Sequence, residues 1–289
     1  GLSYIILKRP DFDKFAGAVY SVAFDTWNPD GKVNQIGTVH QLGDNFAKAF
    51  DLTYEDEEGE HKHCSTTCYG MGFGRTLAAT ISHHGDEHGL VLPPDVAPKQ
   101  VVIVPILFKD KEESIISYCR QIHSLLKDAG IRVTLDDDKR TTPGEKYYKW
   151  EMFGVPIRLE IGPREVDKNT VTMVRRDAYR KTQVEYDDLL KSVENLFLDI
   201  FKNMKQKSWD KLKKEMRDAY SLTELETYIE QRKIVRINWC GEHSCAADIK
   251  DQVAGEVRGT RWDVIEPSTR ECVMCKEKGK YVAYVSRTY

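Results

Sequence analysis

Four cysteines toward the C-terminal end of the sequence constrain the fold more than any other feature. They follow the spacing C-x4-C and, 26 residues later, C-x2-C, and are Cys240, Cys245, Cys272 and Cys275. Each short pair delivers two thiolates to one point, and two pairs fill the tetrahedral shell of Zn²⁺. Four thiolates leave no position for an activated water, so the spacing predicts one structural Zn²⁺ site. The alternatives are four unrelated buried cysteines, or His243 in place of one thiolate.

A second group of possible metal ligands lies within eight positions earlier in the sequence: His61, His63, Cys64 and Cys68. These residues fall on an expected hairpin, where side-chain alternation would divide them between two faces. Packing or solvent exposure is therefore favoured over metal binding there. The seven cysteines are odd in number and no signal-peptide pattern precedes them, which argues against a disulfide framework.

The bulk composition is ordinary, with 31% charged and 40% hydrophobic residues and a net charge of −3. This balance gives no global basic field that would indicate nucleic acid, although it allows a local basic face. No apolar run approaches the ~20 residues needed to span a membrane, and we expect a cytoplasmic protein without membrane contact. The length suits roughly two or three domains. Because Gly1 is not a natural start, we expect the chain to be part of a longer protein.

Three segments with different patterns predict three domains. Residues 1–98 mix short strands with glycine-rich turns and end in a proline-rich linker. Residues 99–205 begin with the apolar run VVIVPILF, typical of a strand buried on both faces. Their β-α-β-α-β-β-α order predicts a mixed sheet covered by helices, with a turn at 162–170 and a long helix from about Glu185. Residues 206–289 contain Lys-rich helices followed by the cysteine-containing tail.

The stretch QIGTVH predicts a strand on which Thr38 and His40 share a face, with Gln35 just upstream. A solvated edge strand would explain the pattern, and the wall of a pocket is the functional alternative. Farther along, GMGFGR ends in Arg75 and precedes a helix expected to begin at Thr76. Alternate glycines let a ligand approach the backbone, and the guanidinium is a planar fork for phosphate. Taken alone, this glycine-rich start of a helix is a weak signal.

Together these segments resemble the prolyl-tRNA synthetases of the archaeal–eukaryotic type. The matching strings are KFAGAVY, QIGTVHQLGDNFAKAF, TTCYGMGFGRTLAA, HGDEHGLVLPPDVAPKQVVIVPI, WEMFGVPIRLEIGPRE and VRRD, and they span essentially the whole chain. The resemblance implies an α/β and α+β multidomain fold. Its parts would be the end of a class II antiparallel-sheet catalytic domain in 1–98, a mixed-sheet α/β anticodon-binding domain in 99–205, and a small zinc-binding α/β tail in 206–289.

The resemblance also implies roles for residues of the first segment. Gln35 and Thr38 would bind ATP, and His40 would face the bound proline. Arg75 matches the arginine of the third class II signature, which holds the ATP triphosphate. Chemically, an amide, a hydroxyl and an imidazole converge where amino acid and adenylate meet, and a guanidinium neutralises phosphate. The C-terminal Tyr289 would lie toward the active site.

In the second segment, Glu151, Arg158 and Arg164 match positions that read the two guanines of a proline anticodon. Arginine can donate twice to guanine, and a carboxylate can accept from its amino and imino groups. Alternation along VPIRLEIG predicts that Arg158 points away from the core, beside the helix that carries Glu151. The alternative is a surface salt bridge between these two residues. The Lys-rich stretch 202–217 is either a solvated face or a phosphate contact.

The function implied is that of a proline–tRNA ligase using ATP with Mg²⁺, L-proline and proline tRNA. No side chain need act as a covalent nucleophile, because the proline carboxylate attacks the α-phosphate and catalysis rests on positioning and charge neutralisation. The first and second class II signatures are expected outside this chain, and the full-length enzyme is expected to be a homodimer. The alternative is a non-catalytic tRNA-binding or regulatory relative, which need not keep the set of Gln35, Thr38 and His40.

Overall fold

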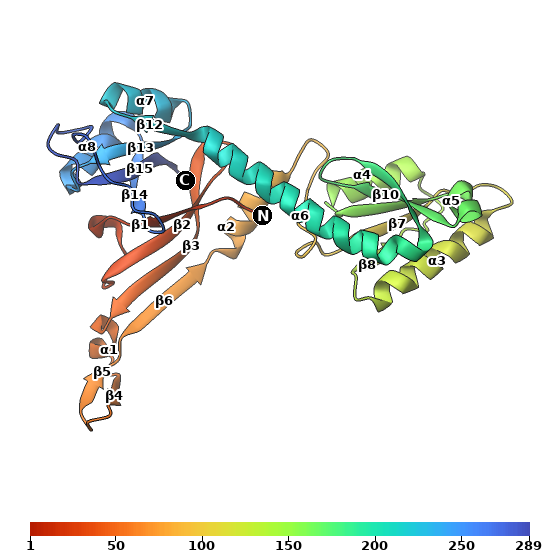
Figure 1. The fold of residues 1–289 in the computed structure, drawn as a ribbon, viewed down its shortest axis with the longest axis horizontal. Coiled ribbons are helices and arrows are strands. Elements are labelled where there is room, and N and C mark those ends of the chain that lie inside the picture. The colour runs from red at the N-terminus through yellow and green to blue at the C-terminus, as the bar shows by residue number, and fades with distance from the viewer. The chain divides into compact units, whose positions relative to one another are not determined.

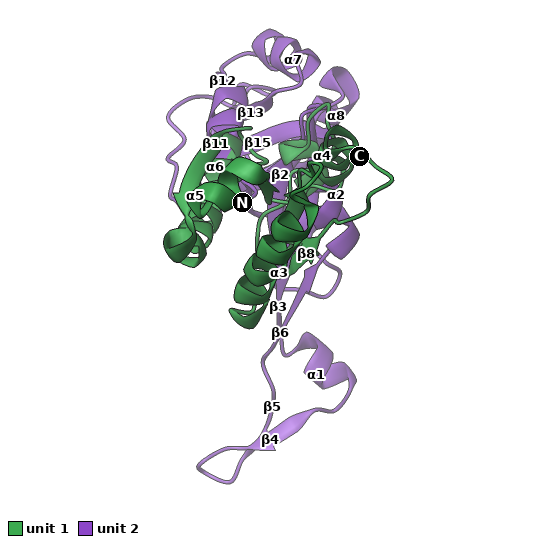
Figure 2. Cartoon of the chain, turned by 90° about the vertical axis from the view of Figure 1, so that its right-hand side faces the viewer, with its two compact units in different colours: residues 1, 80–208 green, residues 2–79, 209–289 purple.

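The computed structural model describes all residues 1–289, which fall into two compact units (Figure 2). Unit 1 contains residues 1 and 80–208, and unit 2 contains residues 2–79 and 209–289. The first and last segments of the chain, expected as separate domains, therefore pack together in unit 2. The functional division at 98/99 and 205/206 stays a prediction. No helix is both long and apolar enough to cross a membrane.

Unit 2 is built on one eight-stranded sheet with the order β12-β13-β15-β14-β1-β2-β3-β6 (Figure 1). The N-terminal segment supplies β1 (Ile5–Lys8), β2 (Tyr20–Trp27), β3 (Lys32–Gly43) and β6 (Thr66–Met71). The C-terminal segment supplies β12 (Met216–Ala219), β13 (Ile234–Trp239), β14 (Glu256–Arg261) and β15 (Tyr281–Thr288). Two pairings join the segments: β1 runs antiparallel to β14, and β15 runs parallel to the start of β3.

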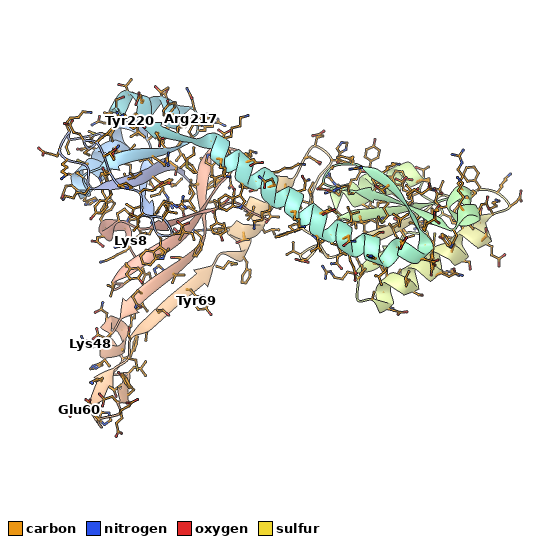
Figure 3. All side chains as sticks on the ribbon, in the orientation of Figure 1. Lys8, Lys48, Glu60, Tyr69, Arg217 and Tyr220 are labelled. Carbon is orange, nitrogen blue, oxygen red and sulfur yellow. The ribbon has the colours of Figure 1, made fainter.

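Helices and a hairpin complete unit 2. The helices are α1 (Asn45–Ala49), the first part of α2 (Phe73–His84), the end of α6 (Leu189–Glu215), α7 (Leu222–Glu230) and α8 (His243–Val253), with a 3-10 turn at Asp11–Asp13. The predicted hairpin is present as β4 (Thr53–Glu55) and β5 (His61–His63), and its acidic tip carries Glu60 (Figure 3). Only Lys-rich helices were expected at the start of the C-terminal segment, but the strand β12 lies between α6 and α7. The reason is tertiary: β12 pairs with β13, and Ala219 is fully buried there.

Unit 1 has a five-stranded mixed sheet in the order β11-β10-β9-β7-β8. Its strands are β7 (Val101–Pro105), β8 (Val133–Leu135), β9 (Ile157–Ile161), β10 (Thr170–Arg175) and β11 (Lys181–Glu185). β7 runs parallel to its neighbours β8 and β9, and β10 runs antiparallel to its neighbours β9 and β11. The helices are the end of α2, α3 (Glu112–Asp128), α4 (Pro143–Met152), α5 (Pro163–Lys168) and most of α6 (Leu189–Glu215), which begins after a 3-10 turn at Tyr186–Asp188. The predicted mixed sheet and long helix are confirmed.

The predicted turn at 162–170 contains the short helix α5, which the sequence analysis missed. Pro163 occupies the first helical turn, where its missing N–H costs nothing. The Glu165 carboxylate accepts a hydrogen bond from the Gly162 N–H at 3.0 Å, which satisfies one of the free donors at the helix start. Asn169 then ends the helix in the left-handed conformation, at φ +51°.

Candidate active site, anticodon-reading site and metal centre

A β-bulge in β3 places three predicted site residues on one face of the unit 2 sheet. His40 pairs with Ser21 and Thr38 with Ala23, as simple alternation requires. The register then shifts, so that Gly37 pairs with Phe24 and Gln35 with Asp25, leaving Ile36 unpaired. Without this extra residue, Gln35 would lie on the opposite face from Thr38. The bulge therefore brings Gln35, Thr38 and His40 together.

Hydrogen bonds fix the His40 ring on this face. Thr38 Oγ1 donates its single proton to the Val22 carbonyl at 3.2 Å, so toward His40 Nε2, 3.3 Å away, it can only accept. Ser21 Oγ accepts from the Phe15 N–H at 2.9 Å and is 2.7 Å from His40 Nδ1. These bonds select the neutral Nε2–H tautomer, with Ser21 donating to Nδ1.

Burial supports the same protonation state of His40. The Phe15 ring covers the imidazole with a centroid separation of 4.7 Å, and burial lowers the pKa of His40 below its ordinary value. Ser21 was not predicted from the sequence as a site residue. The only available signal was a serine within an apolar strand, and its link to His40 depends on the cross-strand register.

Next to Gln35 the same face carries a buried charge network that joins the two ends of the chain. Asp25 Oδ2 accepts from Arg258 Nε of β14 at 2.9 Å and lies 3.7 Å from Arg9 Nη1. Arg9 also donates to the Arg258 carbonyl at 2.7 Å. All three side chains are at least nine-tenths buried. Burial, with the nearby Arg258 charge as a lesser cause, lowers the pKa of Arg9.

Arg75 lies on the first turns of α2, which begins at Phe73 rather than at Thr76 as expected. The Gly72 N–H donates to the Ile36 carbonyl at the bulge at 2.9 Å, which holds the start of α2 against β3. Arg75 Nη1 donates to the Gln35 carbonyl at 3.3 Å, and the guanidinium is otherwise exposed. The structure thus places the predicted phosphate-binding arginine directly beside the Gln35–Thr38–His40 face.

The opposite face of these strands is apolar. It forms a hollow of about 530 Å³ whose lining includes Phe24, Val39, Tyr69 and Met71. Tyr69 projects from β6 and is 82% exposed (Figure 3). The polar side chains suited to chemistry are therefore confined to the other face.

In unit 1, the structure joins Glu151 and Arg158 as predicted. The apolar residues of β9 face the core, and Arg158 points to the other face, where Nη1 donates to Glu151 Oε1 at 2.6 Å. Arg158 also donates to Glu160 Oε1 at 3.0 and 3.1 Å and lies 4.0 Å from the Tyr147 ring centroid. Only 9% of Arg158 is exposed, so this ion pair is a buried one rather than the surface salt bridge considered as the alternative.

Arg164 is exposed on α5 and makes no hydrogen bond or ion pair with Glu151 or Arg158. The structure therefore brings together two of the three predicted anticodon-reading residues and leaves the third separate. A neighbouring network of hydrogen bonds, centred on Arg176, was not predicted from the sequence. Arg176 binds both carboxylate oxygens of Asp86, at 2.5 and 2.6 Å, and Tyr179 Oη at 2.6 Å.

The four cysteines of the predicted metal centre do converge. Their Sγ atoms all lie within 4.8 Å of one another, and all but Cys275 are buried. Tetrahedral Zn²⁺ with Zn–S bonds of about 2.3 Å requires sulfur–sulfur separations of about 3.8 Å, so the donor set and its spacing fit this ion. His243 instead stacks on Phe12, with ring centroids 4.3 Å apart. The earlier group of histidines and cysteines, residues 61–68, forms no comparable cluster.

Tyr289 does not reach the His40 side of β3. Its Oη donates to Asp30 at 2.8 Å and accepts from Asn28 Nδ2 at 2.9 Å, in the turn between β2 and β3. This turn precedes Gln35 at the other end of β3 from His40, and the expectation that Tyr289 lies toward the active site stays a prediction.

Family models match three parts of the chain. Residues 1–84 match the tRNA synthetase class II core domain (G, H, P, S and T), residues 100–196 match an anticodon binding domain, and residues 222–289 match the prolyl-tRNA synthetase C-terminal model. Curated relatives include the proline–tRNA ligases of Methanothermobacter thermautotrophicus, 43% identical over 95% of this chain, and Methanosarcina mazei, 45% identical over 98%. The chain spans 56% and 58% of their respective lengths.

Solved structures of prolyl-tRNA synthetase from Cryptosporidium parvum match all of this chain with TM-scores of 0.93. One, at 31% identity, is complexed with halofuginone and AMPPNP, and one, at 30%, with L-proline and AMP. The chain covers 60% and 62% of these structures. Sequence and fold agree across both units, and the chain is similar along its whole length to part of a prolyl-tRNA synthetase.

Proposed function

We propose that this chain acts, within a protein of the length of its relatives, as part of a proline–tRNA ligase. That enzyme would activate L-proline with ATP and Mg²⁺ and transfer it to proline tRNA. The observation that carries the proposal is the bulge at Ile36, which gathers Gln35, Thr38 and His40 on one face beside Arg75. A sheet used only as a scaffold does not require this convergence of an amide, a hydroxyl, an imidazole and a guanidinium.

In this proposal Arg75 binds the phosphates of ATP. Its guanidinium has one N–H committed to the Gln35 carbonyl, so the remaining donors can neutralise negative charge that develops during attack on the α-phosphate. Gln35 and Thr38 contribute an amide and a hydroxyl to nucleotide binding. No nucleophile from the protein is needed, because the proline carboxylate attacks phosphorus directly and the protein positions the reactants.

His40 would face the bound proline as a neutral imidazole. Ser21 donates to Nδ1 and the Thr38 oxygen accepts from Nε2–H, which fixes the ring plane. A neutral ring does not repel the secondary ammonium group of proline, whereas an imidazolium would. The depressed pKa of His40 is consistent with this requirement.

Glu151, Arg158 and Arg164 are proposed to read the guanines of the proline anticodon. Arg158 is fully paired with Glu151 and Glu160, so binding of a guanine edge would exchange one of these contacts for a bidentate contact to the base. Arg164, exposed on α5, would be the outer contact. We further propose one structural Zn²⁺ on the four cysteines, a homodimeric full-length enzyme, and the three functional segments 1–98, 99–205 and 206–289.

The deciding experiment uses an enzyme that extends this chain to the length of its relatives. His40→Ala should raise the Michaelis constant for proline in ATP–pyrophosphate exchange by about 10- to 100-fold, because it removes a ring that lines a closed pocket, where even one missing apolar group costs about 1–3 kcal/mol. The constant for ATP should change much less. Equal losses for both substrates would show a folding role, and absence of proline-dependent exchange by the unmodified enzyme would favour the non-catalytic relative.

Arg158→Ala separates the two proposed sites of the same enzyme. It should leave proline activation unchanged, because that reaction uses residues of unit 2. It should raise the Michaelis constant for native tRNA by a factor equivalent to the ~1–3 kcal/mol typical of a bidentate guanine contact. The increase should be smaller for tRNA whose anticodon guanines are replaced. An equal penalty for both tRNAs would instead show a phosphate or packing contact.

A further inference from the structure

Three exposed rings gather next to Glu151 in unit 1, and no part of the proposed reaction uses them. His88 follows α2, Tyr148 lies on α4, and Tyr179 lies in the turn between β10 and β11. Tyr148 is 67% and Tyr179 41% exposed. The His88 ring lies nearly parallel to the Tyr148 ring, with centroids 6.5 Å apart and a 24° angle, and meets Tyr179 edge-on at 5.3 Å.

The rings border the groups proposed to read the anticodon. His88 Nδ1 is 4.0 Å from Glu151 Oε2. Tyr179 lines the same small cavity, of about 10 Å³, as Glu151 and Arg158. A base held at the Glu151–Arg158 pair would therefore have the aromatic faces of this cluster beside it. Arg180, which is exposed and follows Tyr179 directly, adds a cation suited to a phosphate of the same strand.

The backbone that carries His88 is fixed rather than loose. The Leu90 N–H donates to the Met152 carbonyl at the end of α4, at 3.2 Å. Gly89 has φ +126°, and a Cβ there would lie 2.5 Å from the Met152 Cα, so only glycine permits this close approach. The Asp86 carboxylate, bound by the buried Arg176, also accepts from the His88 N–H at 3.0 Å. The pairing with Arg176 lowers the pKa of Asp86 to about 2.

The position of Tyr179 is also fixed, by its backbone conformation and by hydrogen bonds of its hydroxyl group. Its backbone is in the left-handed region, at φ +54°, which disfavours a bulky residue. Its hydroxyl donates to Asp86 at 3.1 Å and accepts from Arg176 at 2.6 Å. Two segments nearly a hundred residues apart in sequence are thus tied by one ion pair, whose arginine is buried, so that both present an aromatic ring to solvent.

Fixed, solvent-facing rings beside a hydrogen-bonding pair are the arrangement by which proteins bind unpaired RNA bases. Stacking is tolerant of base identity because every base has a π-face, while the edge contacts supply specificity. We propose that His88, Tyr148 and Tyr179 form a stacking platform for a nucleobase of the anticodon loop, adjacent to the base read by Glu151 and Arg158. This inference rests on the proposed tRNA function and adds a binding site to it.

The test uses the 289-residue chain and a fluorescently labelled proline anticodon stem–loop, with affinity measured by anisotropy. Tyr148→Ala should weaken binding by about 5- to 150-fold, the range for loss of one stacked base. Tyr148→Phe should bind as the unmodified chain does, because it keeps the ring. Tyr54→Ala, which removes a 49%-exposed ring from the hairpin of unit 2, is the matched control and should have no effect.

Base replacement distinguishes the platform from the reading pair. The penalty of Tyr148→Ala should persist when the anticodon guanines are replaced, whereas that of Arg158→Ala should shrink. In addition, the fluorescent base 2-aminopurine can be placed at each loop position in turn. Binding to the chain should quench its fluorescence at one of these positions, and Tyr148→Ala should remove that quenching. Circular dichroism of the variant should match that of the unmodified chain.

Two results would overturn the inference in different ways. If Arg158→Ala weakens binding but Tyr148→Ala and His88→Ala do not, the rings are not a platform while the anticodon function stands. If the unmodified chain binds the proline stem–loop no better than a hairpin of unrelated loop sequence, both the platform and the proposed anticodon function are wrong.

Discussion

Asp25 offers a quantitative test of how the two ends of the chain are held together in unit 2. Its carboxylate on β2 is 2% exposed and binds Arg258 of β14, with Arg9 of β1 alongside. At an effective dielectric constant of ~20, the attractions at 2.9 and 3.7 Å amount to roughly 6 and 4 kcal/mol. Desolvation of the buried ions offsets most of this sum.

Removing only the carboxylate leaves two buried guanidinium groups without their shared partner. Breaking a buried pair in this way typically costs about 3–5 kcal/mol. For a denaturant dependence of ~2 kcal/mol per molar urea, Asp25→Ala should lower the unfolding midpoint of unit 2 by about 1.5–2.5 M. Asp25→Asn should recover part of the loss, because an amide oxygen can still accept from Arg258.

The assay is urea unfolding followed by tryptophan fluorescence in a Trp150→Phe background. The other four tryptophans, Trp27, Trp209, Trp239 and Trp262, all lie in unit 2, so the signal reports that unit alone. Glu57→Ala removes the same charge from the exposed hairpin tip and serves as the control. A shift below about 0.5 M for Asp25→Ala, or one equal to that of Glu57→Ala, would refute the reasoning.

Metal analysis should find one Zn²⁺ per chain and Cys272→Ser should lose it; a folded tail with no zinc would refute the metal centre. Ser21→Ala should free His40 Nδ1, so that ¹⁵N NMR shows a mixture of tautomers in place of Nε2–H alone; an unchanged tautomer would mean that Thr38 suffices. Burial, with the neighbouring His83 as a lesser cause, lowers the pKa of His84 to about 4. Protonation of His84 therefore favours the unfolded chain, so the free energy of unfolding of unit 1 should be constant above pH ~6.5 and fall by up to roughly 3 kcal/mol as the pH drops toward 4. Trp150 fluorescence can follow this unfolding, and His84→Gln should abolish the pH dependence.

Sequence periodicity predicted those parts of the site that depend on local geometry. Alternation placed Thr38 and His40 on one face, and it placed Arg158 opposite the core beside Glu151. The position of Gln35 was not predictable in this way, because an odd separation from Thr38 implies opposite faces unless a bulge intervenes. Nothing in a single strand indicates that bulge; it appears only when β2 and β3 are paired.

Contacts between distant segments were also beyond sequence reasoning. Asp86 and Arg176 are 90 residues apart, and neither stands out in its own segment. Similarly, β12 is a short stretch next to a Lys-rich helix, and its strand conformation depends on pairing with β13. The cysteine spacing was the exception, because metal coordination restricts spacing strongly enough to reveal a contact between residues about thirty positions apart.

The shared sheet of unit 2 has a consequence for synthesis on the ribosome. β3 cannot gain its parallel neighbour β15 until residues more than 240 positions later are made, because Arg287 and Thr288 provide that pairing. At ~5–20 residues per second, roughly 10–40 s pass between completion of the N-terminal strands and emergence of β15. During this interval unit 1 can fold, while the apolar strands β1 to β3 form a sheet whose β1 edge has no pairing partner until β14 is made. Nascent chains stalled before β15 should therefore be bound by chaperones through the N-terminal strands, and premature termination near the C-terminus should cause aggregation rather than yield a shortened folded protein.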